Sequence, residues 1–171
     1  MQNITKQNNS TSCFVCGQEN PHSLKTKFYA LDENTLVAEF TTLDEHQSYP
    51  GVLHGGIAAA ILDETMGRTI LNIDDSLWGV TIDLNLKYRK PLPTDEKIYA
   101  KAILESSNKR TFSCRGAIIL PDGKPAVTAT GKFMKLTLSQ ITSGGDFRSH
   151  WFLVKDKESV NIPDYVLNCP I

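Results

Sequence analysis

Residues 49–71 of the chain read Tyr-Pro-Gly-Val-Leu-His-Gly-Gly-Ile-Ala-Ala-Ala-Ile-Leu-Asp-Glu-Thr-Met-Gly-Arg-Thr-Ile-Leu. A Pro-Gly turn and a glycine pair precede a run of alanine, isoleucine and leucine, which favours a helix. Glycines at a helix start leave backbone N–H groups open to a ligand. The three-alanine run makes this helix thin enough to lie close against a sheet. We therefore predict one long helix from Gly55 to about Asn72.

Two adjacent carboxylates, Asp63 and Glu64, interrupt the apolar part of this helix. Burying a charge costs on the order of several kcal/mol unless the charge is paired or used. Neighbouring residues lie about 100° apart around a helix, so only one of the two acids can face a given site. At least one acid is therefore expected to have a role, and we expect Glu64 to pair with Arg68 four residues later.

Alternation of apolar and polar residues predicts six strands around this helix in the sequence. The clearest alternation runs through residues 78–88, and Pro91-Leu92-Pro93 ends it. On one face of this strand we expect Val80, Ile82, Leu84, Leu86 and Tyr88. On the other face we expect Thr81, Asp83, Asn85 and Lys87. The remaining predicted strands span residues 24–30, 35–40, 97–105, 111–120 and 126–138.

One long helix with five or six antiparallel strands indicates an α+β fold in which the sheet wraps around the helix. The chain has 171 residues, enough for one domain with a real core, which we assign to residues 13–138. Residues 1–12 are polar and are expected to be a disordered N-terminus. Residues 139–171 lack clear periodicity and are expected to be a C-terminal extension, whose aromatic pair Trp151-Phe152 can pack on the domain or on a neighbour.

The composition narrows the class of partner. The formal net charge is -1 and the isoelectric point is about 6.4, which argues against nucleic acid or an anionic membrane as the main partner. No apolar run approaches the roughly 20 residues of a membrane span. The polar first ten residues lack the apolar core of a signal peptide, so we expect a cytoplasmic location.

The cysteines lie at positions 13, 16, 114 and 169. The first two form a Cys-x-x-Cys pattern followed by Gly17, which is compatible with structural cysteines, half of a zinc site or a redox pair. A zinc site normally needs a second half-motif, and none is visible in the sequence. The residues that could complete one are His22, His46 and Cys169. We therefore favour structural cysteines and predict no metal and no cofactor.

The pattern Gly51-Val52-Leu53-His54-Gly55-Gly56, with Asp63 nine residues after the histidine, resembles the hotdog-fold acyl-CoA thioesterases. The nearest branch includes the phenylacetate-degradation and 4-hydroxybenzoyl-CoA thioesterase-like proteins. The strand 79–88 is similar to the family's segment after the helix. Residues 13–17 with Asn20-Pro21 resemble the opening of one bacterial subgroup. The resemblance covers roughly residues 13–138.

The resemblance implies a hydrolase that cleaves acyl-CoA thioesters to the free acid and coenzyme A. The backbone N–H of Gly55 would polarise the thioester carbonyl, and Asp63 would be the nucleophile or the general base. Thr81 falls where relatives often have a Ser or Thr that orients the water. Relatives commonly carry an Asn six residues before the histidine, and here that position is Ser48, with Gln47 beside it.

Other residues around this motif are weaker candidates. His54 is grouped with the catalytic candidates, although the chemistry needs no imidazole and a structural role that holds the loop is favoured. Gly56 and Glu64 are assigned to the substrate-binding surface. Arg89 and Lys90 could bind the phosphates of coenzyme A.

The expected mechanism requires two copies of the chain. A helix rises about 1.5 Å per residue, so Gly55 and Asp63 lie about 12 Å apart along one helix. Asp63 therefore cannot attack a carbonyl held by Gly55 of the same chain. An isologous homodimer would bring the two together, and family resemblance suggests a homotetramer.

Two other functions are compatible with a hotdog domain. A non-catalytic acyl-CoA-binding module is the main alternative, although such a regulator is expected to lack the helix acid and to carry a DNA-binding segment. A dehydratase or hydratase would need an Asp and His pair in a different motif. The presence of Asp63 and the absence of a helix-turn-helix signal favour the hydrolase.

Overall fold

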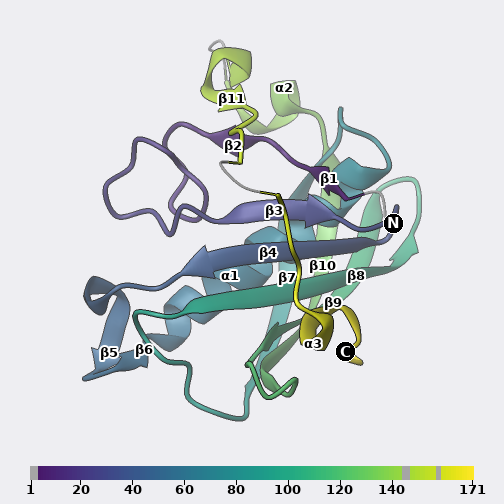
Figure 1. Cartoon of the computed structure of the whole chain (residues 1–171). Helices are drawn as coiled ribbons and strands as arrows, with labels where there is room; N and C mark the ends of the chain where they lie inside the picture. Colours follow the sequence, from purple (N-terminus) through teal and green to yellow (C-terminus); the bar gives the residue numbers. More distant parts are fainter. Residues whose placement is uncertain (1–3, 144–146, 157–158) are drawn as a thin grey trace.

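The computed structural model describes residues 4–143, 147–156 and 159–171. Its main sheet is antiparallel, has the strand order β1-β3-β4-β8-β9-β10-β7 and curves around helix α1 (Figure 1). The strands are β1 (Thr5–Lys6), β3 (Lys27–Ala30), β4 (Thr35–Thr41), β7 (Trp78–Tyr88), β8 (Lys97–Ser107), β9 (Thr111–Ile119) and β10 (Pro125–Leu136). This is the predicted α+β hotdog arrangement, with the short β1 added to the six expected strands.

Helix α1 (Gly55–Gly67) begins where the sequence predicts and continues into the 3-10 turn η2 (Arg68–Asn72). Its apolar side is buried against the sheet, through Ala58, Ile61, Leu62 and Met66. The helix end approaches β7 very closely, because a Cβ added to Gly79 would lie 2.6 Å from the Gly67 carbonyl oxygen. Small residues at both positions therefore bring α1 and β7 into backbone contact.

The strict alternation predicted for residues 78–88 is wrong at one point. The pairing of β7 with β10 skips Ile82, since Phe133 pairs with Thr81 and Lys132 pairs with Asp83. This β-bulge inserts one extra residue and changes which side chains face the helix. Thr81 therefore faces α1, as Leu84, Leu86 and Tyr88 do beyond the bulge. By contrast, Val80 and Ile82 are exposed.

The N-terminal segment differs from the expectation of disorder wherever the structure describes it, and residues 1–3 lie outside the described residues. β1 pairs with β3, and β2 (Asn9–Ser10) pairs with β11 (Trp151–Phe152). The side chain of Asn9 is fully buried and its amide donates to the carbonyl oxygens of Cys16 and Thr26. These hydrogen bonds satisfy the buried polar backbone, which explains why a polar sequence is ordered here.

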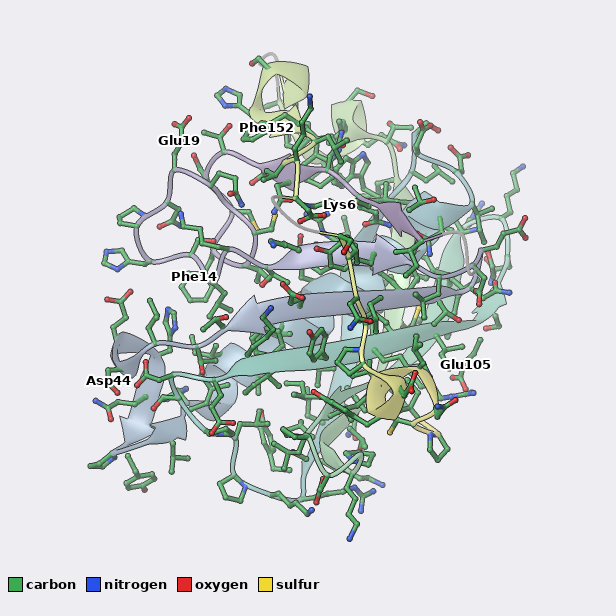
Figure 2. The ribbon with its side chains drawn as sticks, in the orientation of Figure 1. Lys6, Phe14, Glu19, Asp44, Glu105 and Phe152 are labelled. Carbon is green, nitrogen blue, oxygen red and sulfur yellow. The ribbon has the colours of Figure 1, made fainter. Side chains whose placement is uncertain are left out.

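The C-terminal segment crosses the face of the sheet opposite α1 (Figure 1). Helix α3 (Asp164–Leu167) contributes to a second apolar cluster there, and Lys101 Nζ donates to the carbonyl oxygens of Val166, Leu167 and Cys169. Lys6 lies beside this segment (Figure 2). Its ammonium pairs with Asp156 at 2.6 Å. The proposed domain limits at residues 12 and 138 remain predictions.

The remaining elements are η1 (Asp44–His46), β5 (Gln47–Tyr49), β6 (Val52–Leu53), α2 (Leu138–Ile141) and η3 (Phe147–His150). Among the described residues, no helix combines the length and apolar character needed to cross a membrane.

Candidate active site

The start of α1 is built around His54 and the two glycines. His54 is the N-cap residue, and its Nδ1 accepts a 2.9 Å hydrogen bond from the N–H of Gly56. A Cβ at Gly56 would lie 3.0 Å from that nitrogen, so the close imidazole requires a small residue. Within the described residues, no acceptor takes up the N–H of Gly55. His54 therefore caps the helix, and Gly55 keeps an unpaired donor at the positive helix end.

Tyr88, the last residue of β7, contacts this end of the helix. Its hydroxyl donates a 2.8 Å hydrogen bond to the carbonyl oxygen of Gly55. Gly55, Tyr88, Arg89 and Lys90 line a cavity of about 340 Å³. Lys90 also forms an ion pair with Asp122 at 2.8 Å. The two basic residues thus lie beside the predicted oxyanion donor, as a phosphate-binding role would require.

Asp63 lies farther along α1 and faces β7. Its Oδ1 accepts a 2.7 Å hydrogen bond from Thr81 Oγ1. Burial raises the pKa of the Asp63 carboxyl, the Thr81 hydrogen bond lowers it, and the nearby charge of Glu64 raises it further. The net effect is a raised pKa, which makes Asp63 a better proton acceptor than an exposed carboxylate.

A second cavity, of about 550 Å³, opens beside Asp63 and Thr81. One wall comes from the N-terminal segment 10–13, and another comes from aromatic residues of β7 and the C-terminal extension. Trp78 and Trp151 meet edge to face with ring centroids 4.5 Å apart, and Phe147 packs against both rings. The cavity therefore offers an apolar lining next to a carboxylate, which suits an acyl group.

Glu64 pairs with Arg68, as predicted. Arg68 Nε lies 2.7 Å from Glu64 Oε1, and the guanidinium stacks over the rings of Phe28 and Trp151. Arg68 is only 4% exposed and Glu64 is 30% exposed, so the guanidinium is buried while the carboxylate reaches the cavity surface. Glu64 still lines the cavity beside Asp63.

The structure brings together some of the sequence-predicted residues and separates others. Asp63 and Thr81 are in direct contact, whereas Gly55 lines the other cavity, and the two cavities share no lining residue. Gln47 and Ser48 are exposed in β5 and line neither cavity. One chain therefore contains two candidate half-sites, one around each end of α1.

Sequence reasoning missed three residues that shape these half-sites, namely Trp78, Tyr88 as a helix-start ligand, and Arg68 as a buried cation. Trp78 and Tyr88 were assigned only as strand residues. The sequence did show an aromatic residue at each end of the strand that follows the helix. Whether these side chains face the helix depends on the bulge, which the sequence does not show.

Comparison with known proteins identifies relatives of this chain. Residues 50–127 match the thioesterase superfamily model. The acyl-coenzyme A thioesterase THEM4 of Mus musculus is 31% identical over 110 residues, which are 64% of this chain and 46% of that protein. Acyl-coenzyme A thioesterase 13 of Homo sapiens is 30% identical over 79 residues, 46% of this chain and 56% of that protein. The chain thus spans about half the length of these curated relatives.

A solved structure agrees with the sequence match. The crystal structure of a thioesterase superfamily protein superimposes with a TM-score of 0.64 and 27% identity, covering 71% of this chain and 62% of that one. The match to the superfamily model includes the helix with His54, Gly55 and Asp63 and the strand with Thr81. Residues 50–127 are therefore similar to the thioesterase superfamily, and the chain has the hotdog fold that the sequence resemblance implied.

Proposed function

We propose that this protein hydrolyses acyl-CoA thioesters to the free acid and coenzyme A. The observation that carries the proposal is the Asp63–Thr81 pair at the edge of an apolar cavity. A thioesterase needs a carboxylate with raised basicity beside the carbonyl, and it needs a place for the acyl group. The 550 Å³ cavity supplies that place, and the curated relatives support the choice of acyl-CoA as substrate.

In the proposed mechanism, Asp63 acts as general base or nucleophile. As a base, it takes a proton from a water molecule, whose oxygen attacks the thioester carbonyl carbon. The carbonyl oxygen becomes an oxyanion, which the Gly55 N–H and the positive end of α1 stabilise. Collapse of the intermediate breaks the C–S bond, and the departing thiolate takes the proton that Asp63 removed from the water, which gives coenzyme A and restores the carboxylate. Thr81 holds the carboxylate in position throughout.

The Gly55 donor must come from a second copy of the chain, so we propose a homodimer. An exposed strand edge supports this assembly. β7 is the last strand of the sheet, and within the described residues no strand pairs with its outer edge along 11 residues. Val80 and Ile82 are 37% and 50% exposed beside that edge. A long unpaired strand edge of this kind is normally covered. A tetramer of two such dimers remains a prediction.

Coenzyme A is proposed to lie across the dimer. Its phosphates would meet Arg89 and Lys90 near Gly55 of one copy, while the acyl group enters the cavity beside Asp63 of the other. This arrangement uses both cavities and accounts for the charge at one end and the aromatic lining at the other.

Turnover of a panel of acyl-CoA thioesters, followed with a free-thiol dye, tests the proposal. Asp63→Ala and Asp63→Asn should each lower kcat by at least about a hundredfold, because loss of a general base typically costs 10²–10⁴. Saturable acyl-CoA binding with no turnover would instead establish the alternative, a binding module. Activity that survives both substitutions would contradict the role of Asp63 and direct attention to Glu64.

A further inference from the structure

The loop that carries Cys13 and Cys16 has the geometry of a metal-binding turn. The backbone N–H groups of Val15 and Cys16 point at Cys13 Sγ, with N···S distances of 3.3 and 3.4 Å. The N–H of Gly17 donates to the Cys13 carbonyl oxygen at 2.8 Å, and a Cβ at Gly17 would lie 2.4 Å from that oxygen. The turn therefore requires glycine after the second cysteine, and it directs N–H dipoles that stabilise a thiolate.

Helix α1 adds a third ligand atom to this turn. Cys13 Sγ lies 4.0 Å from Glu64 Oε1, and one donor atom each of Cys13, Cys16 and Glu64 lies within 4.8 Å of the others. In tetrahedral zinc sites, Zn–S bonds of about 2.3 Å and Zn–O bonds of about 2.0–2.2 Å separate the ligand atoms by roughly 3.5–3.8 Å. Side-chain rotations that move these ligand atoms by up to about 1 Å suffice to reach that geometry.

Arg68 lets this half-buried cluster accept a divalent cation without a net charge. Its Nη2 lies 2.9 Å from Cys16 Sγ, its Nε 2.7 Å from Glu64 Oε1, and its Nη1 donates to the Asn8 carbonyl oxygen. With both thiols protonated, Arg68 and Glu64 neutralise each other. With a divalent ion bound and both thiol protons released, two thiolates and one carboxylate balance the ion and the guanidinium. Both states avoid an uncompensated buried charge.

A coordinated thiol loses its proton outright, so binding of the metal itself removes the protons of Cys13 and Cys16.

We propose that Cys13, Cys16 and Glu64 bind one Zn²⁺ per chain, with a water molecule from the adjoining cavity as the fourth ligand. Two thiolates favour zinc over magnesium or calcium. Cys13 and Glu64 line the same cavity as Asp63, so the ion ties the N-terminal segment to α1 beside the acyl cavity. This site is independent of the proposed hydrolysis, and it replaces the expectation from the sequence that the protein binds no metal.

Metal titration of the reduced, chelator-treated full chain tests the site. One equivalent of Co²⁺ should give thiolate-to-metal charge-transfer absorption, and Zn²⁺ should remove it by displacement. The double variant Cys13→Ser/Cys16→Ser should lose this signal, and Glu64→Gln should weaken zinc affinity by at least about tenfold. Cys114→Ser is the matched control and should bind as the wild type does, because Cys114 lies under α1 against Thr69. Absence of the signal in the wild type, or its persistence in the double variant, would overturn the proposal.

A second measurement needs no substitution and so does not depend on the folding of a variant. Zn²⁺ should slow the alkylation of Cys13 and Cys16 in the wild-type chain by at least about tenfold, since a zinc-bound thiolate is a poor nucleophile toward the reagent. Cys114 and Cys169 should react at unchanged rates. Equal alkylation of the first two cysteines with and without Zn²⁺ would refute the site, whatever the protein's activity toward thioesters.

Discussion

Thr81 and Asp63 are joined by a 2.7 Å hydrogen bond between the Thr81 hydroxyl and Oδ1 of the carboxylate, 18 residues apart in the sequence. The contact depends on the β-bulge at Ile82, which turns Thr81 toward α1. Without the bulge, an alternating strand that presents Leu84, Leu86 and Tyr88 to the helix would point Thr81 to the other side. The bulge therefore supplies the Asp63 carboxylate with its only described hydrogen-bond partner.

Removal of this hydroxyl should impair the proposed reaction. Thr81→Val keeps the shape of the side chain but deletes the hydrogen bond, so we expect kcat to fall by about tenfold to a hundredfold, as for loss of a hydrogen bond to a charged group. The hydrogen bond lowers the pKa of Asp63, so its loss should also move the acidic limb of the pH–rate profile to higher pH. Thr81→Ser is the control and should restore both properties. An unchanged profile in Thr81→Val would show that Thr81 does not act through Asp63.

The raised pKa of Asp63 predicts that this carboxylate destabilises the fold at neutral pH. Folded protein holds the Asp63 proton more tightly than unfolded protein, so stability falls as pH rises from the unfolded pKa through the folded one. Asp63→Asn removes this cost while its side-chain oxygen can still accept from Thr81. We expect the melting temperature of the variant to exceed that of the wild type at pH 7, and the difference to shrink as the pH approaches 4. A lower melting temperature at pH 7 would contradict the assigned burial effect.

Trp151 should influence which acyl groups are accepted. It lines the cavity beside Asp63 and packs against Trp78 and Arg68. Trp151→Ala should lower kcat/KM for aryl or medium-chain substrates relative to acetyl-CoA by at least about tenfold, because larger acyl groups lose more apolar contact. The neighbouring Phe152→Ala is the matched control, since Phe152 lies outside the cavity. An equal loss for all acyl groups would mean that Trp151 supports the fold rather than selecting the substrate.

Mixing two inactive variants tests the shared site directly. Gly55→Pro deletes the proposed oxyanion donor, and proline is compatible with the first residue of a helix that follows extended backbone, as at His54. Gly55→Pro and Asp63→Asn homodimers should each be inactive. A hybrid dimer regains one complete site, so equal mixing and re-equilibration should restore about a quarter of wild-type activity.

The matched control for this experiment is a chain that carries both substitutions. Mixed with the wild type, it forms hybrids in which one site lacks Asp63 and the other lacks Gly55. Such a hybrid therefore contains no complete site. If the two single variants exchange subunits, as followed by native mass spectrometry, and activity stays absent, then Gly55 and Asp63 do not act across a dimer.

Much of the active-site region was predictable from local pattern. The glycine pair and alanine run mark the start of α1 at Gly55, and the ion pair between Glu64 and Arg68 follows from helical spacing. The strands were recognised from their alternation, since a half-buried strand repeats every two residues. Each of these features depends only on residues within one helical turn or one strand, so it can be read from a short stretch of sequence.

Three features depended on contacts between distant segments. Residues 4–12 were expected to be disordered because their composition is polar, yet β2 is ordered by pairing with β11 about 140 residues later. Glu64 was not considered as a partner of Cys13 and Cys16, because a search for Cys and His half-motifs overlooks an acid on another element. The cavity beside Asp63 likewise combines residues from both chain ends with β7.

The amino-acid sequence by itself determined an α+β fold and the position of the central helix, because periodicity and helix-start residues reflect local conformational preferences. Its resemblance to hotdog thioesterases implied the hotdog fold and the choice of Gly55 and Asp63 as candidate functional groups. Only the tertiary structure decided that Thr81 contacts Asp63, that both termini enclose the cavity and that Cys13, Cys16 and Glu64 converge. A bulge shifts a strand by one residue, and long-range pairing joins segments with no shared local signal, so neither can be recognised before the chain is folded.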